Sequence, residues 1–315
     1  ARLVRFGRAS ATVLNDMVRS QPSLLAGSLA PLLRVPQLRA TVDFENKRAF
    51  FRAQIRERFS KDAGRATFDL RVRRESLLSD TFERVRRVTA EALRGKLRVT
   101  FVGEEGVDAG GVTREFYSVL SREIFKPDYA LFEASADAPT YQPRRDSSIN
   151  DRHLDYFFVV GRMLGKAICD GELLDVHFTR AVHKHMLGLD VSYADIDASD
   201  PQFFRSLQSI MDDPIDDLYL GLTFSVSEEH FGETRTVELV PGGAEIDVTD
   251  ANKHAYATLV ARHKLTDAIR PQLNAFLRGF FQLVPRDLIS IFSEAELELM
   301  IAGLPEIDLE DLKRN

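Results

Sequence analysis

Histidines and acidic residues are numerous enough for metal binding or acid–base chemistry, but their spacing suits neither. Of the seven histidines, His183 and His185 lie closest together. Two residues apart on a helix, they point to different faces, whereas zinc needs four converging ligands. Asp170, Glu172 and Asp175 surround a glycine turn and could act as a carboxylate pair, but helix termination and solvation explain them more simply. We therefore expect no metal site.

Cys169 is the only cysteine, which excludes an internal disulfide and a multi-cysteine metal site. It lies in an apolar helical stretch, and no base is adjacent to it in sequence. A nucleophilic cysteine needs exposure and a lowered pKa, so we interpret Cys169 as a packed core residue. A single cysteine also fits a reducing compartment, the cytoplasm or the nucleus.

The segment from Gly103 to Phe116 reads GEEGVDAGGVTREF, follows a predicted strand and opens a predicted helix. Glycines before a helix N-terminus have the layout of a phosphate-binding loop. However, the loop lacks lysine, carries three acidic residues and matches neither a P-loop nor a dinucleotide fingerprint. We interpret it as a structural turn, with Asp108 capping the helix and Arg114 or Glu115 pinning its neighbours through charge-assisted hydrogen bonds.

The elements that would position these residues are mainly helical. Strict alternation of apolar and polar residues predicts strands at 68–73 and 97–102. Apolar spacing predicts helices at 10–19, 22–33, 44–59, 75–93, 112–125, 151–170, 178–187, 201–211, 250–269, 271–283, 286–292 and 294–302. Asp43 is the expected N-cap of the helix at 44–59. A short strand at 129–134, a polar loop at 137–150 and a strand-rich insert at 222–248 complete the pattern; the insert contains strands at 222–226, 234–239 and 245–248 and a Pro241-Gly242-Gly243 turn.

Composition narrows the class of protein. The 315 residues are 44% hydrophobic and 29% charged, and no apolar run approaches the roughly 20 residues of a membrane-spanning helix, so we expect no membrane partner.

The first 100 residues carry 22 basic against 10 acidic side chains, and the rest carry 20 against 38. Because the arginines are interleaved with acids, we interpret the imbalance as solvated charge and do not expect a nucleic-acid partner. The missing initiator Met leads us to expect a piece of a longer protein.

The segment from Gly103 to Phe116 resembles the signature of HECT-type ubiquitin ligases. The similarity continues in order over roughly residues 40–315, with family-like motifs at 120–125, 129–132, 157–175, 177–178, 222–224, 231–232, 238–243, 248–253, 292–299 and 303–308. Arg34-Val35-Pro36 makes the chain most similar to the HECT ligases that also contain UBA and WWE domains, and to their fungal and protist relatives.

The resemblance implies a mainly helical α+β fold, the N-lobe of a bilobal HECT domain. It divides the chain into N-terminal linker helices at 1–40 and an N-lobe at 41–315 that is incomplete at its C-terminal end. A small mixed α/β subdomain, inserted late at about 200–260, is expected within the N-lobe. The C-lobe is absent, since no Cys preceded by His-Thr and followed by Phe-Asn occurs in the sequence. The linker helices are hypothesised to buttress the lobe or tune its activity.

The resemblance also implies a binding site for a ubiquitin-conjugating enzyme, in an apolar groove of the small subdomain. The corresponding residues are Phe203, Ser206, Leu207, Leu220, Leu222, Tyr256 and Val260. Phe203 and Leu207 lie four residues apart on one helix face, as do Tyr256 and Val260. The alternative is that these residues are simply the core of the subdomain.

The resemblance implies that the N-lobe docks the conjugating enzyme, so that ubiquitin passes by transthiolation to a C-lobe cysteine and then to a substrate lysine. This chain alone, without that cysteine, should not ligate. Its expected partners are the conjugating enzyme, ubiquitin and protein substrates that bind regions outside the chain, and no cofactor is implied. The alternative is a non-catalytic HECT-like module that sequesters conjugating enzymes.

Overall fold

The computed structural model describes residues 2–63, 67–104, 111–135, 139–218, 220–230 and 233–303. It is a mainly helical α+β fold with small sheets, as predicted. The chain divides into two compact units. Unit 1 comprises Ala1–Ser121, Val159–Asp175 and Arg278–Asn315, and unit 2 comprises Arg122–Phe158 and Val176–Leu277. Within the described ranges, no helix is long and apolar enough to span a bilayer.

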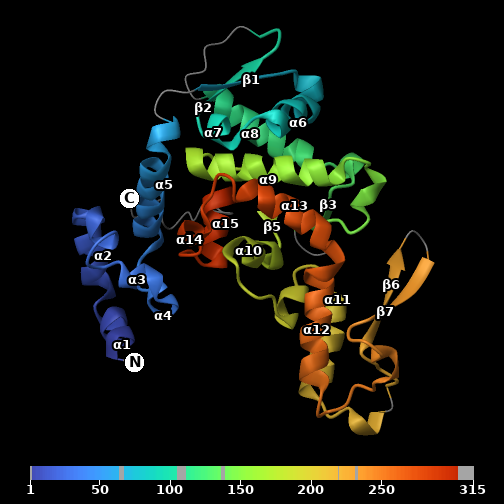
Figure 1. The fold of residues 1–315 in the computed structure, drawn as a ribbon. Coiled ribbons are helices and arrows are strands. Elements are labelled where there is room, and N and C mark those ends of the chain that lie inside the picture. Colours follow the sequence, from blue (N-terminus) through green and yellow to red (C-terminus); the bar gives the residue numbers. More distant parts are fainter. Residues whose placement is uncertain are drawn as a thin grey trace, which may run out of the picture. The chain divides into compact units, whose positions relative to one another are not determined.

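Unit 1 contains a two-stranded parallel sheet with helices around it (Figure 1). Its strands are β1 (Thr67–Val72) and β2 (Lys96–Phe101). Its helices, some of which extend into unit 2, are α1 (Arg2–Ala9), α2 (Ala11–Ser20), α3 (Pro31–Arg34), α4 (Pro36–Arg39), α5 (Phe44–Ala63), α6 (Leu77–Arg87), α7 (Ala90–Leu93), α8 (Gly111–Ile124), α9 (His153–Asp170), α14 (Arg286–Ile289) and α15 (Glu294–Ala302).

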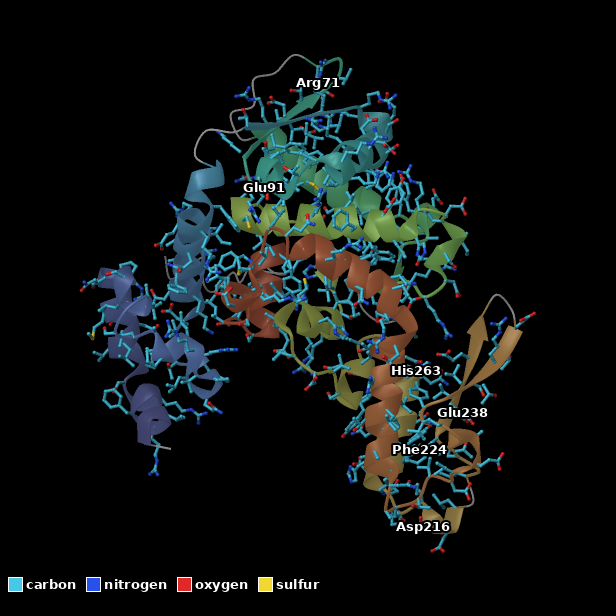
Figure 2. The ribbon with its side chains drawn as sticks, viewed as in Figure 1. Arg71, Glu91, Asp216, Phe224, Glu238 and His263 are labelled. Carbon is cyan, nitrogen blue, oxygen red and sulfur yellow. The ribbon has the colours of Figure 1, made fainter. Side chains whose placement is uncertain are left out.

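The two strands of unit 1 confirm the alternation in the sequence. Phe68 pairs with Leu97 and Leu70 with Val99, and all four side chains are buried. The residues between them, such as Arg71, are exposed on the other face (Figure 2). Alternation works here because successive side chains of a strand point to opposite faces.

Two predicted helices of unit 1 are each broken. The helix predicted at 22–33 is a short 3-10 turn followed by α3, because Gly27 and Ser28 interrupt it. The helix predicted at 75–93 is α6 and α7, separated at Val88, which has an extended backbone. The N-cap of α5 is confirmed, since the Asn46 amide donates to Oδ1 of Asp43 at 2.8 Å.

Unit 2 holds a three-stranded sheet of order β3-β4-β5 and a separate hairpin. The sheet strands are β3 (Phe132–Ala134), β4 (Thr140–Pro143) and β5 (His177–Phe178), and the hairpin strands are β6 (Ser225–His230) and β7 (Glu233–Glu238). The helices are α10 (Arg180–Leu187), α11 (Pro201–Asp212), α12 (Lys253–Leu265) and α13 (Arg270–Phe280), whose last residues belong to unit 1.

Three of the strand and loop predictions in unit 2 are wrong. The predicted loop at 137–150 contains β4, which pairs with β3 and β5 despite its polar composition. The segment predicted as a strand at 129–134 opens as a 3-10 turn and is extended only in β3. The predicted strand at 245–248 has only an isolated bridge from Asp247 to Thr223.

One hydrophobic core joins the hairpin to α11 and α12, which lie side by side in Figure 1. The ring of Phe224 packs edge-on against Tyr256, with ring centres 5.7 Å apart. Ala181 and Ile196 join the same cluster from outside residues 200–260. The predicted subdomain therefore shares its core with the segment that precedes it.

Candidate functional site

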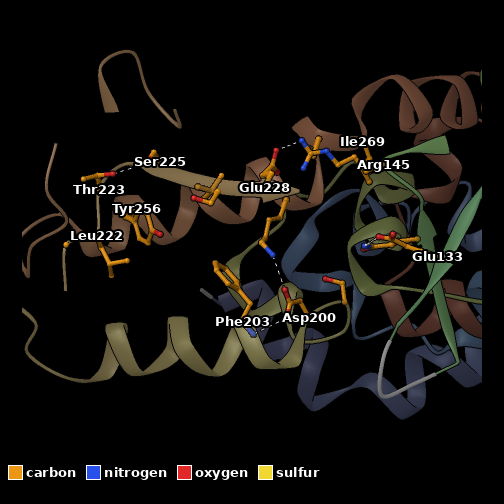
Figure 3. Close-up of a pocket in the computed structure, with 17 residues that line it drawn as sticks. Glu133, Arg145, Asp200, Phe203, Leu222, Thr223, Ser225, Glu228, Tyr256 and Ile269 are labelled. Atoms are coloured by element: carbon orange, nitrogen blue, oxygen red, sulfur yellow. Dashed lines mark hydrogen bonds and ion pairs between the residues drawn. The ribbon is translucent and has the colours of Figure 1, made fainter. Parts of the chain in front are cut away.

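A cavity of about 680 Å³ in unit 2 lies among α11, α12, β6 and the β3–β4 pair (Figure 3). We call it the subdomain cavity. Aromatic, aliphatic and charged side chains all line it. They include Phe203, Leu222, Tyr256, Ile269, Asp200, Lys264, Glu228 and Arg145.

Three of the seven residues expected from the family resemblance line this cavity. Phe203 comes from α11, Tyr256 from α12 and Leu222 from the segment before β6 (Figure 3). Phe203 and Leu222 are partly exposed, whereas Tyr256 is only 5% exposed, and its burial raises the pKa of its hydroxyl. The structure thus brings together residues that are more than 50 positions apart in the sequence.

The other four expected residues lie elsewhere. Leu207 and Val260 are buried in the core that includes Tyr256, so they support the cavity wall from behind. Ser206 is exposed on α11 and donates a hydrogen bond to the Gln202 carbonyl at 3.2 Å. Leu220 is 48% exposed and does not line the cavity. For Leu207 and Val260, the structure therefore fits the alternative that they belong to the core of the subdomain.

Two further exposed apolar side chains accompany Leu220. Leu218 is 55% exposed and Ile246 is 42% exposed. Backbone hydrogen bonds from Phe224 to Ile246 and from Val248 to Leu222 hold the segments 220–224 and 246–248 together. We call Leu218, Leu220 and Leu222, which lie within five residues of one another, the leucine patch; Ile246 lies opposite Phe224, toward the other end of the paired segments. Clustered exposed apolar groups of this kind mark interaction surfaces, whereas single ones do not.

A charged pair on the cavity wall was not anticipated from the sequence. Lys264 Nζ lies 3.0 Å from Oδ2 of Asp200 and 4.1 Å from the centre of the Phe203 ring. Burial alone would raise the pKa of Asp200, but the Phe203 amide and Lys264 outweigh it and hold that pKa below its ordinary value. Helical spacing could have found Lys264, because it follows Tyr256 and Val260 at successive four-residue steps on α12.

Glu228 joins the hairpin to two neighbouring elements. It accepts from Arg145, which follows β4, and its Oε1 lies 2.7 Å from Nε2 of His263 on α12. Burial would raise the pKa of Glu228, yet these two partners hold it below its ordinary value. The side chains of the cavity wall are thus held in place by charge-assisted contacts.

The glycine-rich segment is held at both ends, as the structural interpretation expected. Arg74 donates to Glu104, just after β2, and its Nη1 lies 2.8 Å from Glu115 of α8. Arg114 contacts Glu172 at 4.0 Å. The predicted cap Asp108 lies outside the described residues.

Cys169 is only partly buried, so the prediction of a packed core residue is met in part. Its Sγ lies 3.5 Å from the Leu283 carbonyl, and burial raises the pKa of its thiol to about 12. Neighbouring Asp170 accepts from Lys166 at 2.6 Å, and burial raises the pKa of its carboxyl. A thiol with so high a pKa is a poor nucleophile at neutral pH.

The histidine pair also proves structural. His185 Nε2 lies 3.0 Å from the Leu265 carbonyl oxygen, burial lowers the pKa of His185, and His183 is buried. In the part of the chain that the structure describes, no group of three or more His, Cys, Asp or Glu side chains could hold a metal. The subdomain cavity and leucine patch offer an arrangement suited to binding a protein partner, with aromatic and aliphatic anchors beside paired charges.

The chain also matches a known protein family. The family model described as HECT-domain (ubiquitin-transferase) matches residues 118–315, which is more than half of the chain. The chain belongs to this family, and the family predicted from the motifs is confirmed.

The relatives are long ubiquitin ligases. The chain is 46% identical to the E3 ubiquitin-protein ligase UPL1 of Arabidopsis thaliana, covering 99% of the chain and 8% of that protein. It is 44% identical to TOM1 of Saccharomyces cerevisiae, covering 98% of the chain and 9% of that protein. It is 41% identical to HUWE1 of Mus musculus, covering 100% of the chain and 7% of that protein. The chain thus spans less than a tenth of the length of each of these relatives.

Proposed function

We propose that this chain is the part of a HECT ubiquitin ligase that docks a ubiquitin-conjugating enzyme. The docking surface consists of the leucine patch and the adjoining edge of the subdomain cavity, where Phe203 is partly exposed. The observation that carries the proposal is the leucine patch, in which Leu218 and Leu220 are 55% and 48% exposed within one short segment.

The patch suits a transient protein partner. Leu218 and Leu220 offer apolar area that water solvates poorly, so a partner that covers them gains binding free energy. Phe203 adds an aromatic anchor whose ring is already held by Lys264. Because an anchor held in place loses little side-chain entropy on binding, it favours affinity from a small contact.

In the whole ligase, we propose that ubiquitin moves in two acyl transfers. A C-lobe thiolate attacks the thioester carbonyl of the charged conjugating enzyme, the enzyme's thiol leaves, and a substrate lysine amine then displaces the C-lobe thiol. Cys169 does not serve as that thiolate, since it is only partly exposed and burial raises the pKa of its thiol. The chain supplies proximity by holding the charged enzyme, and substrates bind regions outside it. The reaction takes place in the cytoplasm or the nucleus.

The test is a titration of this chain with a panel of purified ubiquitin-conjugating enzymes. We expect micromolar binding by at least one of them. Leu220→Ala should weaken it about tenfold or more, which is the loss expected for an interface anchor. Leu189→Ala is the matched control, because Leu189 is a 41% exposed leucine of unit 2 outside the patch. Equal affinity for both variants and the wild type would contradict the assigned surface.

A further inference from the structure

A second cavity, in unit 1, has no role in the proposed docking of the conjugating enzyme. It has a volume of about 360 Å³ and lies among α3, α4, α5 and α14. We call it the Arg34 cavity. Leu25, Leu33, Leu288 and Ile291 line it and are at most 5% exposed. The cavity is within the size range of ligand pockets, and its floor favours an apolar group.

The rim of the Arg34 cavity carries three arginines. Arg39 donates to the backbone carbonyls of Leu33 at 2.9 Å and Ser290 at 2.6 Å, so its donors are used but its charge is not neutralised by an acid. Arg58 is held by Asp287 in a two-point contact. Arg34 is exposed, and its side chain makes no hydrogen bond or ion pair within the described ranges of the chain.

The acids near this rim do not balance its cations. Asp287 is the one acidic residue of the described chain that lines the cavity, and it is already paired with Arg58. Glu57 lies next to the rim, where it accepts a hydrogen bond from Gln54 at 2.9 Å. Arg34 and Arg39 therefore leave a local excess of positive charge above an apolar floor.

We propose that the Arg34 cavity binds a short acidic peptide segment of a partner protein. One large apolar side chain of the peptide enters the cavity, and its carboxylates face Arg34 and Arg39. These two arginines come from separate helices, α3 and α4, so several carboxylates spaced along a peptide fit them better than the single headgroup of a lipid. The surplus of basic residues in the first 100 positions, 22 against 10, adds long-range attraction for an acidic segment.

The experiment uses the full 315-residue chain and a fluorescently labelled short peptide with one central Phe flanked by Asp and Glu. We expect saturable binding that weakens with added salt. Replacing the central Phe of the peptide by Ala should weaken binding about tenfold, and so should Arg34→Glu in the protein. Arg71→Glu makes the same charge change at an exposed arginine of β1 outside the cavity, and should leave the affinity within about twofold.

Each other outcome overturns the proposal. Equal losses with Arg34→Glu and Arg71→Glu would mean nonspecific attraction to a basic surface. Insensitivity to the central Phe would mean that the cavity is not filled. Binding of a labelled fatty acid without binding of the peptide would assign the cavity to a lipid. Self-association of the chain that Arg34→Glu abolishes would assign it to a second copy. The test is independent of the conjugating enzyme, so it can fail while the proposed function stands.

Discussion

The ammonium nitrogen of Lys264 lies 4.1 Å from the centre of the Phe203 ring, so a cation on α12 holds an aromatic side chain on α11. The same nitrogen pairs with Asp200, whose Oδ1 accepts from the Phe203 amide at 3.0 Å. Asp200 therefore fixes the start of α11 and also the cation that orients Phe203. The presentation of this predicted anchor depends on two residues that the family resemblance did not point to.

Replacing Asp200 should destabilise α11 through its cap. Asp200→Ala removes both the cap and the ion pair, and should lower the free energy of unfolding by about 1–2 kcal/mol. Asp200→Asn keeps a capping oxygen and loses only the ion pair. Because the pair with Lys264 is partly exposed, the free energy of unfolding should fall by no more than about 0.5 kcal/mol. Urea denaturation followed by circular dichroism measures both. An equal loss in the two variants would show that the ion pair, and not the cap, dominates.

Gly243 should tolerate no side chain. A Cβ there would lie 2.3 Å from the Phe224 carbonyl oxygen, a backbone atom that also accepts from the Leu239 amide. Gly243→Ala should therefore lower the free energy of unfolding by about 3 kcal/mol. Gly242→Ala is the neighbouring control: its φ of +72° is strained for alanine but nothing crowds the Cβ, so about 1 kcal/mol is expected. A smaller loss for Gly243→Ala than for Gly242→Ala would refute the close approach.

Asn15 should contribute more to the stability of the fold than its position on a short N-terminal helix suggests. Its side chain donates to the Thr41 carbonyl at 2.9 Å and accepts from the Asp43 amide at 2.9 Å and from Asn46 at 3.0 Å. The N-terminal helices are thereby tied to the start of α5, in line with the hypothesis that they buttress the lobe. Asn15→Ala should cost roughly 2–3 kcal/mol of stability, because it removes these three hydrogen bonds and a fourth to the Ala11 carbonyl within the helix.

The control for Asn15 is Ser20→Ala on the same helix. The Ser20 hydroxyl is exposed and, among the residues that the structure describes, bonds only to the Asp16 carbonyl one turn back, so the change should stay within about 0.5 kcal/mol. Thermal unfolding by calorimetry compares the two variants. If Asn15→Ala unfolds at the same temperature as Ser20→Ala, the N-terminal helices contribute nothing to the lobe through this contact.

Cys169 should be chemically silent in the folded protein. Its pKa of about 12 leaves very little thiolate at neutral pH, and the thiolate is the reactive form. Alkylation by iodoacetamide at pH 7.5 should be slow in buffer and fast in urea. The chain should likewise take no ubiquitin from a charged conjugating enzyme as a thioester. Rapid native alkylation, or a thioester removed by reducing agent, would show that the thiol is accessible.

Local patterns in the sequence predicted the elements well wherever one feature dominated. Alternation of apolar and polar residues identified β1 and β2, and Asp43 identified the start of α5. The predictions failed where tertiary pairing decides. β4 is polar and extended because β3 and β5 pair with it on either side, and strand propensity depends on such partners.

The candidate site was only partly predictable for a similar reason. Four-residue spacing places Tyr256 and Val260 on one face of α12, but it cannot say whether that face is core or surface. In the structure both are nearly buried, while Leu220, which lies in no regular element, is exposed. Lys264 continues the same face and could have been found. Its partner Asp200 is far away in sequence, and only the packing of α11 against α12 brings the two together.

The most direct test of the proposed docking is hydrogen–deuterium exchange of this chain with and without a saturating ubiquitin-conjugating enzyme that binds it. Backbone amides at 203–208 and 220–224 should exchange more slowly in the complex, because these segments carry Phe203 and the leucine patch. Amides of β1 and β2 in unit 1 should be unchanged and serve as the internal reference. Protection confined to other segments, with 220–224 unaffected, would contradict the assigned docking surface.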